Sequence, residues 1–176
     1  MSDSDKIMRA LEFASQKHKG QKRIGGIDYI THPIAVCQMV KEKGYGEDYQ
    51  LTALFHDLLE DTDATESEIL SLSNQNVLTA VKLLTKQKGY DMKSYVESIK
   101  KNPIAFVVKS ADRLHNLNSA LVTSKEFKRK YILETVDWYL DFSKEIKTAV
   151  KKLAESLDTP IAELSFLYAP VESWKI

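Results

Sequence analysis

The sequence has few of the residues that interrupt helices or crosslink chains. Its 176 residues include 6 glycines, 4 prolines and one cysteine, Cys37. A single cysteine excludes an intramolecular disulfide and suits a reducing compartment. No apolar run approaches the roughly 18 residues that a membrane span needs, and the amino terminus lacks the layout of a signal peptide. We therefore expect a cytoplasmic protein that has no membrane partner.

An excess of charge of one sign is also lacking, because 25 basic residues balance 25 acidic ones. No overall field would draw the chain to nucleic acid, so any affinity for phosphate must come from a local cluster. The sequence specifies no oligomeric state. At this length we expect a single domain over residues 1–176, which can bury a core without disulfides or a structural metal.

Glycine and proline fall between the periodic stretches, which favours helices joined by short loops. Apolar residues recur at spacings of three and four from Ile7 to Ala14, and Thr65 with Glu68 forms a capping box at the start of a later helix. Further helices are expected over about 104–121 and, as the longest one, over about 127–153. The sequence therefore predicts an all-α, single-domain, multi-helix bundle without a sheet.

One predicted apolar helix, marked by Leu51, Leu54, Phe55 and Leu58, carries the polar segment HDLLEDT at residues 56–62. Residues four apart on a helix lie above each other, so Glu60 would stand over His56 and Asp61 over Asp57. Three carboxylates this close repel one another, and in a partly buried site they would take up protons unless a cation holds them ionised. The alternative is a solvated helix end whose acidic side chains face water.

Two further candidate ligands lie on other predicted helices: His32 at a helix start in THPIAV, and Asp112 in SADRLHN. Two imidazoles and two carboxylates would suit Mn²⁺, Fe²⁺, Co²⁺ or Zn²⁺ and would leave positions for water or a substrate oxygen. Such a metal activates water and polarises a phosphoryl oxygen, while Glu60 or Asp61 could take the proton. Taken singly, His32 could be a core histidine and Asp112 a paired surface carboxylate.

Resemblance to a known family is carried by three segments in order, HKGQKRIGGIDYITHP, HDLLEDT and KSADRLHNL. They resemble motifs of the HD-domain metal-dependent phosphohydrolases and, more narrowly, of the SpoT/RelA-type alarmone (p)ppGpp hydrolases and their free-standing small relatives. The resemblance covers residues 6 to about 150 and leaves 151–176 as a C-terminal helix and tail. It implies removal of the 3′-pyrophosphate of (p)ppGpp, giving GDP or GTP and pyrophosphate. The chain ends before a synthetase domain could begin, so only hydrolysis is implied.

The resemblance also implies roles for individual residues. It implies one Mn²⁺ bound by His32, His56, Asp57 and Asp112, with Glu60 and Asp61 activating water, and it implies that Arg23 packs on a small-molecule nucleotide substrate. Other substrate contacts are expected from Asn116, Ser119 and Tyr139. Ammonium groups can serve phosphate oxygens, and the candidates for this role are Lys17, Lys19, Lys22, Lys86 and Lys109.

Two departures from the family pattern bear on the choice of substrate. Ile24 stands where the residue after the stacking arginine is commonly basic, and GGIDY replaces the more usual glycine-x-proline-tyrosine. They keep open the same chemistry on a nucleoside monophosphate, on a 2′- or 3′-phosphorylated nucleotide, or on NADPH. A third alternative is a non-catalytic nucleotide sensor, which would have no physical need for all six residues, the four ligands and the two that activate water. A plain helical scaffold, the fourth, predicts no bound metal.

Overall fold

The computed structural model describes residues 3–175, whose contacts divide into two compact units, one up to Ala111 and one from Asp112 onward. No strand forms among the described residues apart from an isolated bridge between Lys22 and Asp28. The prediction of an all-α fold is confirmed, whereas one domain over residues 1–176 stays a prediction. Within residues 3–175, no helix has both the length and the apolar character that a membrane crossing requires.

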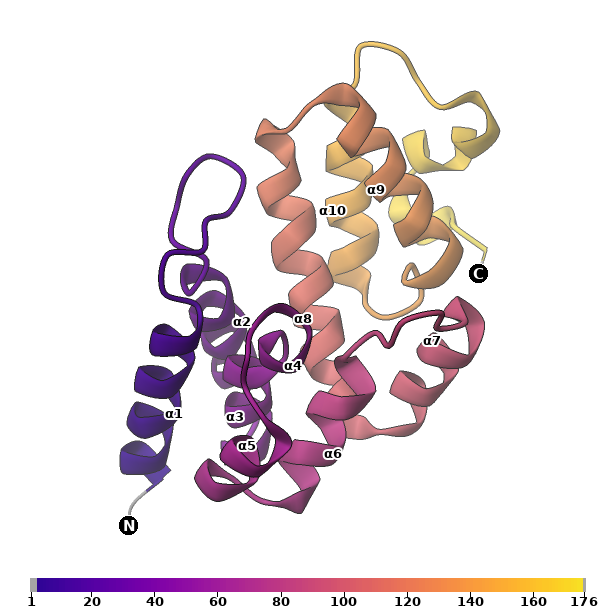
Figure 1. The fold of residues 1–176 in the computed structure, drawn as a ribbon. Coiled ribbons are helices and arrows are strands. Elements are labelled where there is room, and N and C mark those ends of the chain that lie inside the picture. Colours follow the sequence, from indigo (N-terminus) through magenta and orange to yellow (C-terminus); the bar gives the residue numbers. More distant parts are fainter. Residues whose placement is uncertain (1–2, 176) are drawn as a thin grey trace. The chain divides into compact units, whose positions relative to one another are not determined.

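The first unit consists of helices, most of which are joined by short loops (Figure 1). They are α1 (Asp3–Lys17), α2 (Thr31–Glu42), α3 (Glu47–Phe55), α4 (Leu58–Asp61), α5 (Glu66–Leu72), α6 (Gln75–Leu84), α7 (Met92–Lys101) and the beginning of α8 (Pro103–Ser119). The second unit contains the rest of α8, then η1 (Ala120–Val122), α9 (Lys125–Trp138), α10 (Lys144–Glu155), η2 (Ala162–Tyr168) and η3 (Val171–Ser173).

Helix α3 is the centre of the first unit. Five consecutive residues, Leu51 to Phe55, are buried, and the helix packs against α1, α2 and α6. Because consecutive residues of a helix point in different directions, the second half of α3 is buried on every side, which is why it shows no polar stripe. Because His56 and Asp57 directly follow α3, the packing of this helix buries His56 and leaves Asp57 half-buried beside it.

The chain does not continue as one helix through residues 56–62, so the prediction of a single helix carrying the acidic segment is wrong. Helix α3 ends at Phe55 and α4 begins at Leu58, with Asp57 at φ −101° and ψ −6°. The His56 imidazole Nδ1 hydrogen-bonds to the Ala53 carbonyl at 2.7 Å, an acceptor that a continuing helix would offer to the backbone N–H of residue 57. The polar side chain therefore competes with the backbone at the break.

Other local signals act as the sequence predicts. The Glu68 N–H donates to Thr65 Oγ1 at 3.2 Å and the Thr65 N–H donates to Glu68 Oε2 at 2.8 Å, which completes the capping box. Gly44, with φ +84°, lies just past the end of α2. Cys37 is buried in α2, where burial raises the pKa of its thiol to about 11. The thiol is therefore uncharged and belongs to the core.

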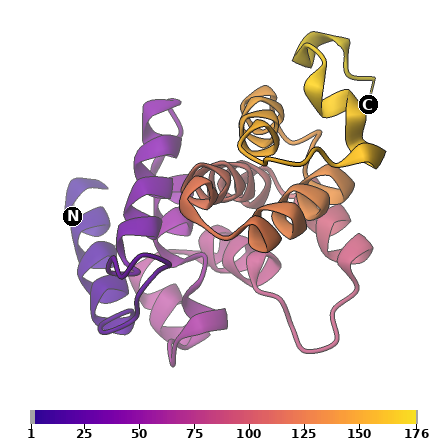
Figure 2. The same cartoon turned by 90° about the horizontal axis from the view of Figure 1, so that it is seen from above.

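The second unit is built around α10, which packs against α9, η2 and η3 (Figure 2). The predicted single helix over 127–153 is wrong, because α9 ends at Trp138 and the Ser143 hydroxyl caps a new helix by accepting from the Ile146 N–H at 3.2 Å. The Lys151 ammonium donates to the Ala169 carbonyl at 2.9 Å. The C-terminal segment is thus fixed to α10, and the predicted tail is packed.

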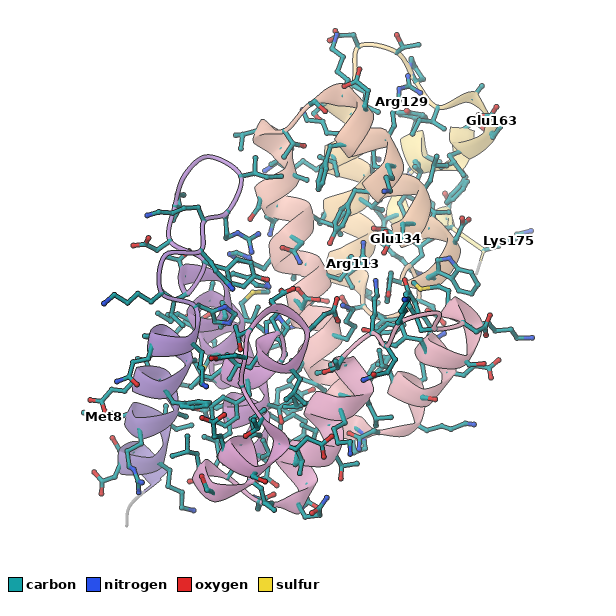
Figure 3. All side chains as sticks on the ribbon, in the orientation of Figure 1. Met8, Arg113, Arg129, Glu134, Glu163 and Lys175 are labelled. Atoms are coloured by element: carbon teal, nitrogen blue, oxygen red, sulfur yellow. The ribbon has the colours of Figure 1, made fainter. Side chains whose placement is uncertain are left out.

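A buried cation links α8 to α9 in the second unit. The Arg113 guanidinium is 3% exposed and lies 4.3 Å and 4.1 Å from the ring centres of Tyr131 and Tyr139. It is paired with Glu134 at 2.5 Å, and Figure 3 shows these two side chains facing each other. Burial opposes the charge, but the two tyrosines and Glu134 together raise the pKa of Arg113 above its ordinary value. Arg113 is therefore charged although it is buried, because its neighbours stabilise the cation.

Replacement of Glu134 by alanine is expected to lower the free energy of unfolding by about 2–4 kcal/mol, because it leaves the Arg113 charge buried without its carboxylate. The melting temperature should fall by roughly 5–10 °C in a thermal unfolding experiment. The double variant Arg113→Met/Glu134→Leu should recover part of this loss. Lys82→Gln, in the exposed pair of Lys82 with Glu66, is the control and should shift the midpoint by about 1–2 °C at most. A Glu134→Ala protein as stable as the unmodified chain would contradict this account.

Candidate metal centre

Three predicted ligand residues converge in the first unit. His32 lies in the first turn of α2, and His56 and Asp57 lie between α3 and α4. The two Nε2 atoms are 3.2 Å apart, and Asp57 Oδ2 lies 3.0 Å from His56 Nε2 and 3.7 Å from His32 Nε2. All three donor atoms lie within 4.8 Å of one another. The packing of α2 against α3 brings together residues that are 24 positions apart in sequence.

The chemistry of these donors fits a divalent cation. Ala53 O can only accept, so the 2.7 Å contact requires a proton on His56 Nδ1 and leaves Nε2 of the neutral ring as a lone-pair donor. This lone pair faces a second imidazole nitrogen and a carboxylate oxygen. The cluster also follows the carboxyl end of α3, where the partial negative charge of the helix favours a cation. Nitrogen and oxygen donors of this kind suit Mn²⁺, Fe²⁺, Co²⁺ or Zn²⁺.

Asp112, the fourth predicted ligand, is the first residue of the second unit and is 5% exposed. Its Oδ1 accepts a hydrogen bond from Asn116 Nδ2 at 2.6 Å, one turn along α8. The Ser119 hydroxyl donates to the His115 carbonyl at 2.9 Å, and Tyr139 is fully buried. The roles of Asp112 as a ligand and of Asn116, Ser119 and Tyr139 as substrate contacts stay predictions.

The two predicted acid–base residues, Glu60 and Asp61, lie on α4, the helix that directly follows His56 and Asp57 in the chain. Asp61 is one turn from Asp57, since its backbone N–H donates to the Asp57 carbonyl at 2.9 Å. Partial burial of its carboxyl and repulsion from Asp57 raise the pKa of Asp61 above its ordinary value, against the opposing effect of a hydrogen bond from Tyr29. A carboxylate with a raised pKa is a better proton acceptor near neutral pH.

Glu60 is held by the loop after α6. Its Oε2 accepts a hydrogen bond from the Lys86 backbone N–H at 2.7 Å. The Lys86 ammonium lies 5.2 Å and 5.6 Å from the ring centres of Tyr90 and Tyr95, a cation–π arrangement. The predicted phosphate contacts of Lys86 and of Lys109, which is half-buried on α8, stay predictions. The link between Glu60 and Lys86 was not foreseen from the sequence.

The loop between α1 and α2 carries Arg23, the predicted nucleotide contact. The Arg23 N–H donates to the Ile27 carbonyl at 2.8 Å, which closes a turn through Gly25 and Gly26, both with positive φ. The guanidinium carbon lies 5.9 Å from the centre of the Tyr29 ring. Ile24, at the tip of this turn, is 62% exposed, so its side chain is available to a ligand or to solvent.

Tyr29 belongs to the site although it is not among the residues predicted from the sequence. Its hydroxyl donates to Asp57 Oδ2 at 2.7 Å and lies 3.2 Å from Asp61 Oδ2. Two features of the sequence point to it: its position three residues before His32, at the entrance of α2, and its match to the tyrosine of the glycine-x-proline-tyrosine pattern.

Curated relatives of this chain are named as a GTP pyrophosphokinase and as a guanosine-3′,5′-bis(diphosphate) 3′-pyrophosphohydrolase. The chain is 32% identical over 180 residues to GTP pyrophosphokinase rsh of Brucella melitensis, covering 96% of this chain and 23% of that protein. It is 33% identical over 144 residues to the guanosine-3′,5′-bis(diphosphate) 3′-pyrophosphohydrolase of Aquifex aeolicus, covering 77% of this chain and 21% of that protein. The chain thus spans less than a quarter of the length of these two relatives.

The fold and the family are shown by two further comparisons. A solved structure of a metazoan ortholog of SpoT, described as hydrolysing ppGpp, aligns with a TM-score of 0.65 at 24% identity and covers 93% of each chain. This likeness shows the fold. The family model of the HD domain matches residues 10–145, a span that contains His32, the His56–Asp57 pair and Asp112. By this match over most of its length, the chain belongs to the HD domain family.

Proposed function

We propose that this chain is a Mn²⁺-dependent hydrolase that removes the 3′-pyrophosphate of ppGpp or pppGpp. The proposal is supported most by one observation, the convergence of His32 Nε2, His56 Nε2 and Asp57 Oδ2 within 4.8 Å. The name of the Aquifex aeolicus relative, a guanosine-3′,5′-bis(diphosphate) 3′-pyrophosphohydrolase, supports ppGpp as the substrate. In this proposal the enzyme acts in the cytoplasm, as part of the stringent response.

The proposed ligands are His32, His56, Asp57 and Asp112. A divalent cation bound by them would polarise a phosphoryl oxygen and make water more acidic. The chain's own contribution is to hold the imidazole and carboxylate donors in fixed orientations, as the hydrogen bond from His56 Nδ1 to the Ala53 carbonyl does. Mn²⁺ is proposed from the family resemblance, because the same donors also suit other transition metals.

Glu60 and Asp61 handle protons in the proposed reaction. The oxygen of water adds to the phosphorus that is bonded to the ribose O3′, and Glu60 or Asp61 accepts the proton of that water. The bond between O3′ and phosphorus breaks, O3′ takes a proton, and the products are pyrophosphate and GDP or GTP. Arg23 contacts the nucleotide, and other contacts are proposed for Asn116, Ser119, Tyr139, Lys86 and Lys109.

Exposed Ile24 favours a second candidate, the same chemistry on another nucleotide. An isoleucine at the tip of the loop that carries Arg23 offers no charge to a phosphate, and it is 62% exposed. The candidates are a nucleoside monophosphate, a 2′- or 3′-phosphorylated nucleotide and NADPH.

A panel of nucleotides incubated with the purified chain and Mn²⁺ tests this proposal. We expect pyrophosphate and GDP from ppGpp, with a kcat/KM at least about 100-fold higher than for NADPH, a nucleoside 3′-phosphate or a nucleoside monophosphate. A higher kcat/KM for one of the other nucleotides would favour the second candidate. Binding of ppGpp without any product would instead indicate a sensor.

A further inference from the structure

Tyr29 acts on the oxygen of Asp57 that faces the candidate cation site. Its hydroxyl donates to Asp57 Oδ2 at 2.7 Å, and the same Oδ2 lies 3.0 Å from His56 Nε2. A carboxylate without such a donor can rotate and present either oxygen. The hydrogen bond therefore selects the orientation in which Oδ2 points toward the two imidazoles.

The hydroxyl of Tyr29 also approaches Asp61. The distance to Asp61 Oδ2 is 3.2 Å, so one phenol oxygen lies between a proposed ligand and a proposed proton acceptor. A phenol has one proton to donate, and the shorter distance assigns it mainly to Asp57. Tyr29 thus lies between two carboxylates that repel each other.

The ring of Tyr29 is itself fixed by the loop before α2. The His18 ring packs on it at a centre-to-centre distance of 4.7 Å and an angle of 31°, and His18 is 2% exposed. Gln21 connects the loop to α4: its Oε1 contacts His18 Nδ1 at 2.8 Å, and its Nε2 donates to the Asp61 carbonyl at 2.7 Å. The Tyr29 N–H donates to the Gln21 carbonyl at 3.0 Å.

We infer that Tyr29 is a positioning residue, whose hydroxyl orients Asp57 toward the cation and whose ring joins this centre to the loop that carries Arg23. The inference rests on the proposed metal centre. Hydrogen-bond partners of metal ligands typically contribute about 10- to 100-fold to metal affinity or activity. The ring and the hydroxyl have separate tasks, because the Arg23 guanidinium lies over the ring face while the hydroxyl contacts the carboxylates.

The test compares Tyr29→Phe with the unmodified chain in a Mn²⁺ titration without nucleotide. Binding is measured by calorimetry and by the electron paramagnetic resonance signal of free Mn²⁺. We expect the Mn²⁺ Kd to rise about 10- to 100-fold. The KM for the nucleotide at saturating Mn²⁺ should stay within about twofold, since phenylalanine keeps the ring beneath Arg23. Tyr49→Phe, which removes a phenol from α3 in the same unit, is the matched control and should bind Mn²⁺ as the unmodified chain does.

A Mn²⁺ Kd for Tyr29→Phe within twofold of the unmodified value would overturn the inference. A raised KM together with an unchanged Mn²⁺ Kd would also overturn it and would mark Tyr29 as a substrate contact. The titration contains no nucleotide, so it separates this inference from the proposed activity. If the unmodified chain binds Mn²⁺ but leaves ppGpp intact, the proposed substrate is wrong. The Mn²⁺ Kd of Tyr29→Phe, compared with that of the unmodified chain, still decides the inference about Tyr29.

Discussion

Replacement of Asp57 by asparagine is expected to lower kcat/KM at least about 1000-fold, which corresponds to a loss of roughly 4 kcal/mol of transition-state stabilisation. Asp57 Oδ2 is the only charged donor among the three atoms that converge in the first unit. Asparagine keeps the size of the side chain and a carbonyl that can accept from Tyr29, but it lacks the negative charge that offsets a divalent cation. The variant should therefore retain no stoichiometric Mn²⁺ after desalting, as measured by elemental analysis.

The thermal stability of Asp57→Asn separates loss of the metal from loss of the fold. A saturating ligand stabilises only a protein that binds it, by about 2.7 kcal/mol at 100 times its Kd. Mn²⁺ should therefore raise the melting temperature of the unmodified chain and leave that of Asp57→Asn unchanged. Asp63→Asn is the control, because its carboxylate is exposed and pairs with Lys17, outside the cluster. An Asp57→Asn protein that keeps both Mn²⁺ and activity would refute the ligand assignment.

Replacement of Glu60 by glutamine is expected to lower kcat about 100- to 10,000-fold, the usual contribution of a positioned general base. Glutamine keeps a carbonyl oxygen that can accept from the Lys86 N–H, so the loop contact made by Glu60 Oε2 is preserved. The ability to take a proton from water is lost. Since Glu60 is not among the three converging donors, the Mn²⁺ content should not change.

Glu66→Gln is the matched control for Glu60→Gln, because Glu66 pairs with Lys82 on the surface of α5. It should have the kcat of the unmodified chain. Single-turnover measurements with saturating nucleotide report the chemical step without product release. Full activity of Glu60→Gln would show that Glu60 is not the base, and Asp61, with its raised pKa, would be tested next by Asp61→Asn.

The helical class follows from the sequence because its signals are local. The capping box at Thr65 and the glycine after α2 need only a few neighbouring residues to act. The two breaks within predicted helices were missed because apolar residues continue across them. Leu54 and Leu58 are buried on either side of the first break, and Tyr139 and Ile146 on either side of the second. The spacing of apolar residues indicates which positions are buried. It does not show whether the helix continues between them, because buried positions lie on both sides of a break.

The candidate site was predictable to the extent that it depends on residue type. Burying an imidazole or a carboxylate in an apolar helix costs free energy, so His32 and the His56–Asp57 pair stand out in the sequence as candidates for a function. Tyr29 carries no such signal, because tyrosine is ordinary at a helix entrance. Its contact with Asp57 spans 28 positions in sequence, and no local pattern encodes a contact of that range.

The central claim is that His32, His56 and Asp57, together with Asp112, bind one divalent ion. Anomalous diffraction from crystals grown with Mn²⁺, recorded on both sides of the manganese absorption edge, tests it most directly. The predicted result is a single manganese peak within bonding distance of His32 Nε2, His56 Nε2, Asp57 Oδ2 and a carboxylate oxygen of Asp112. A manganese peak bound elsewhere, or no peak in crystals of protein that Mn²⁺ activates, would contradict the claim.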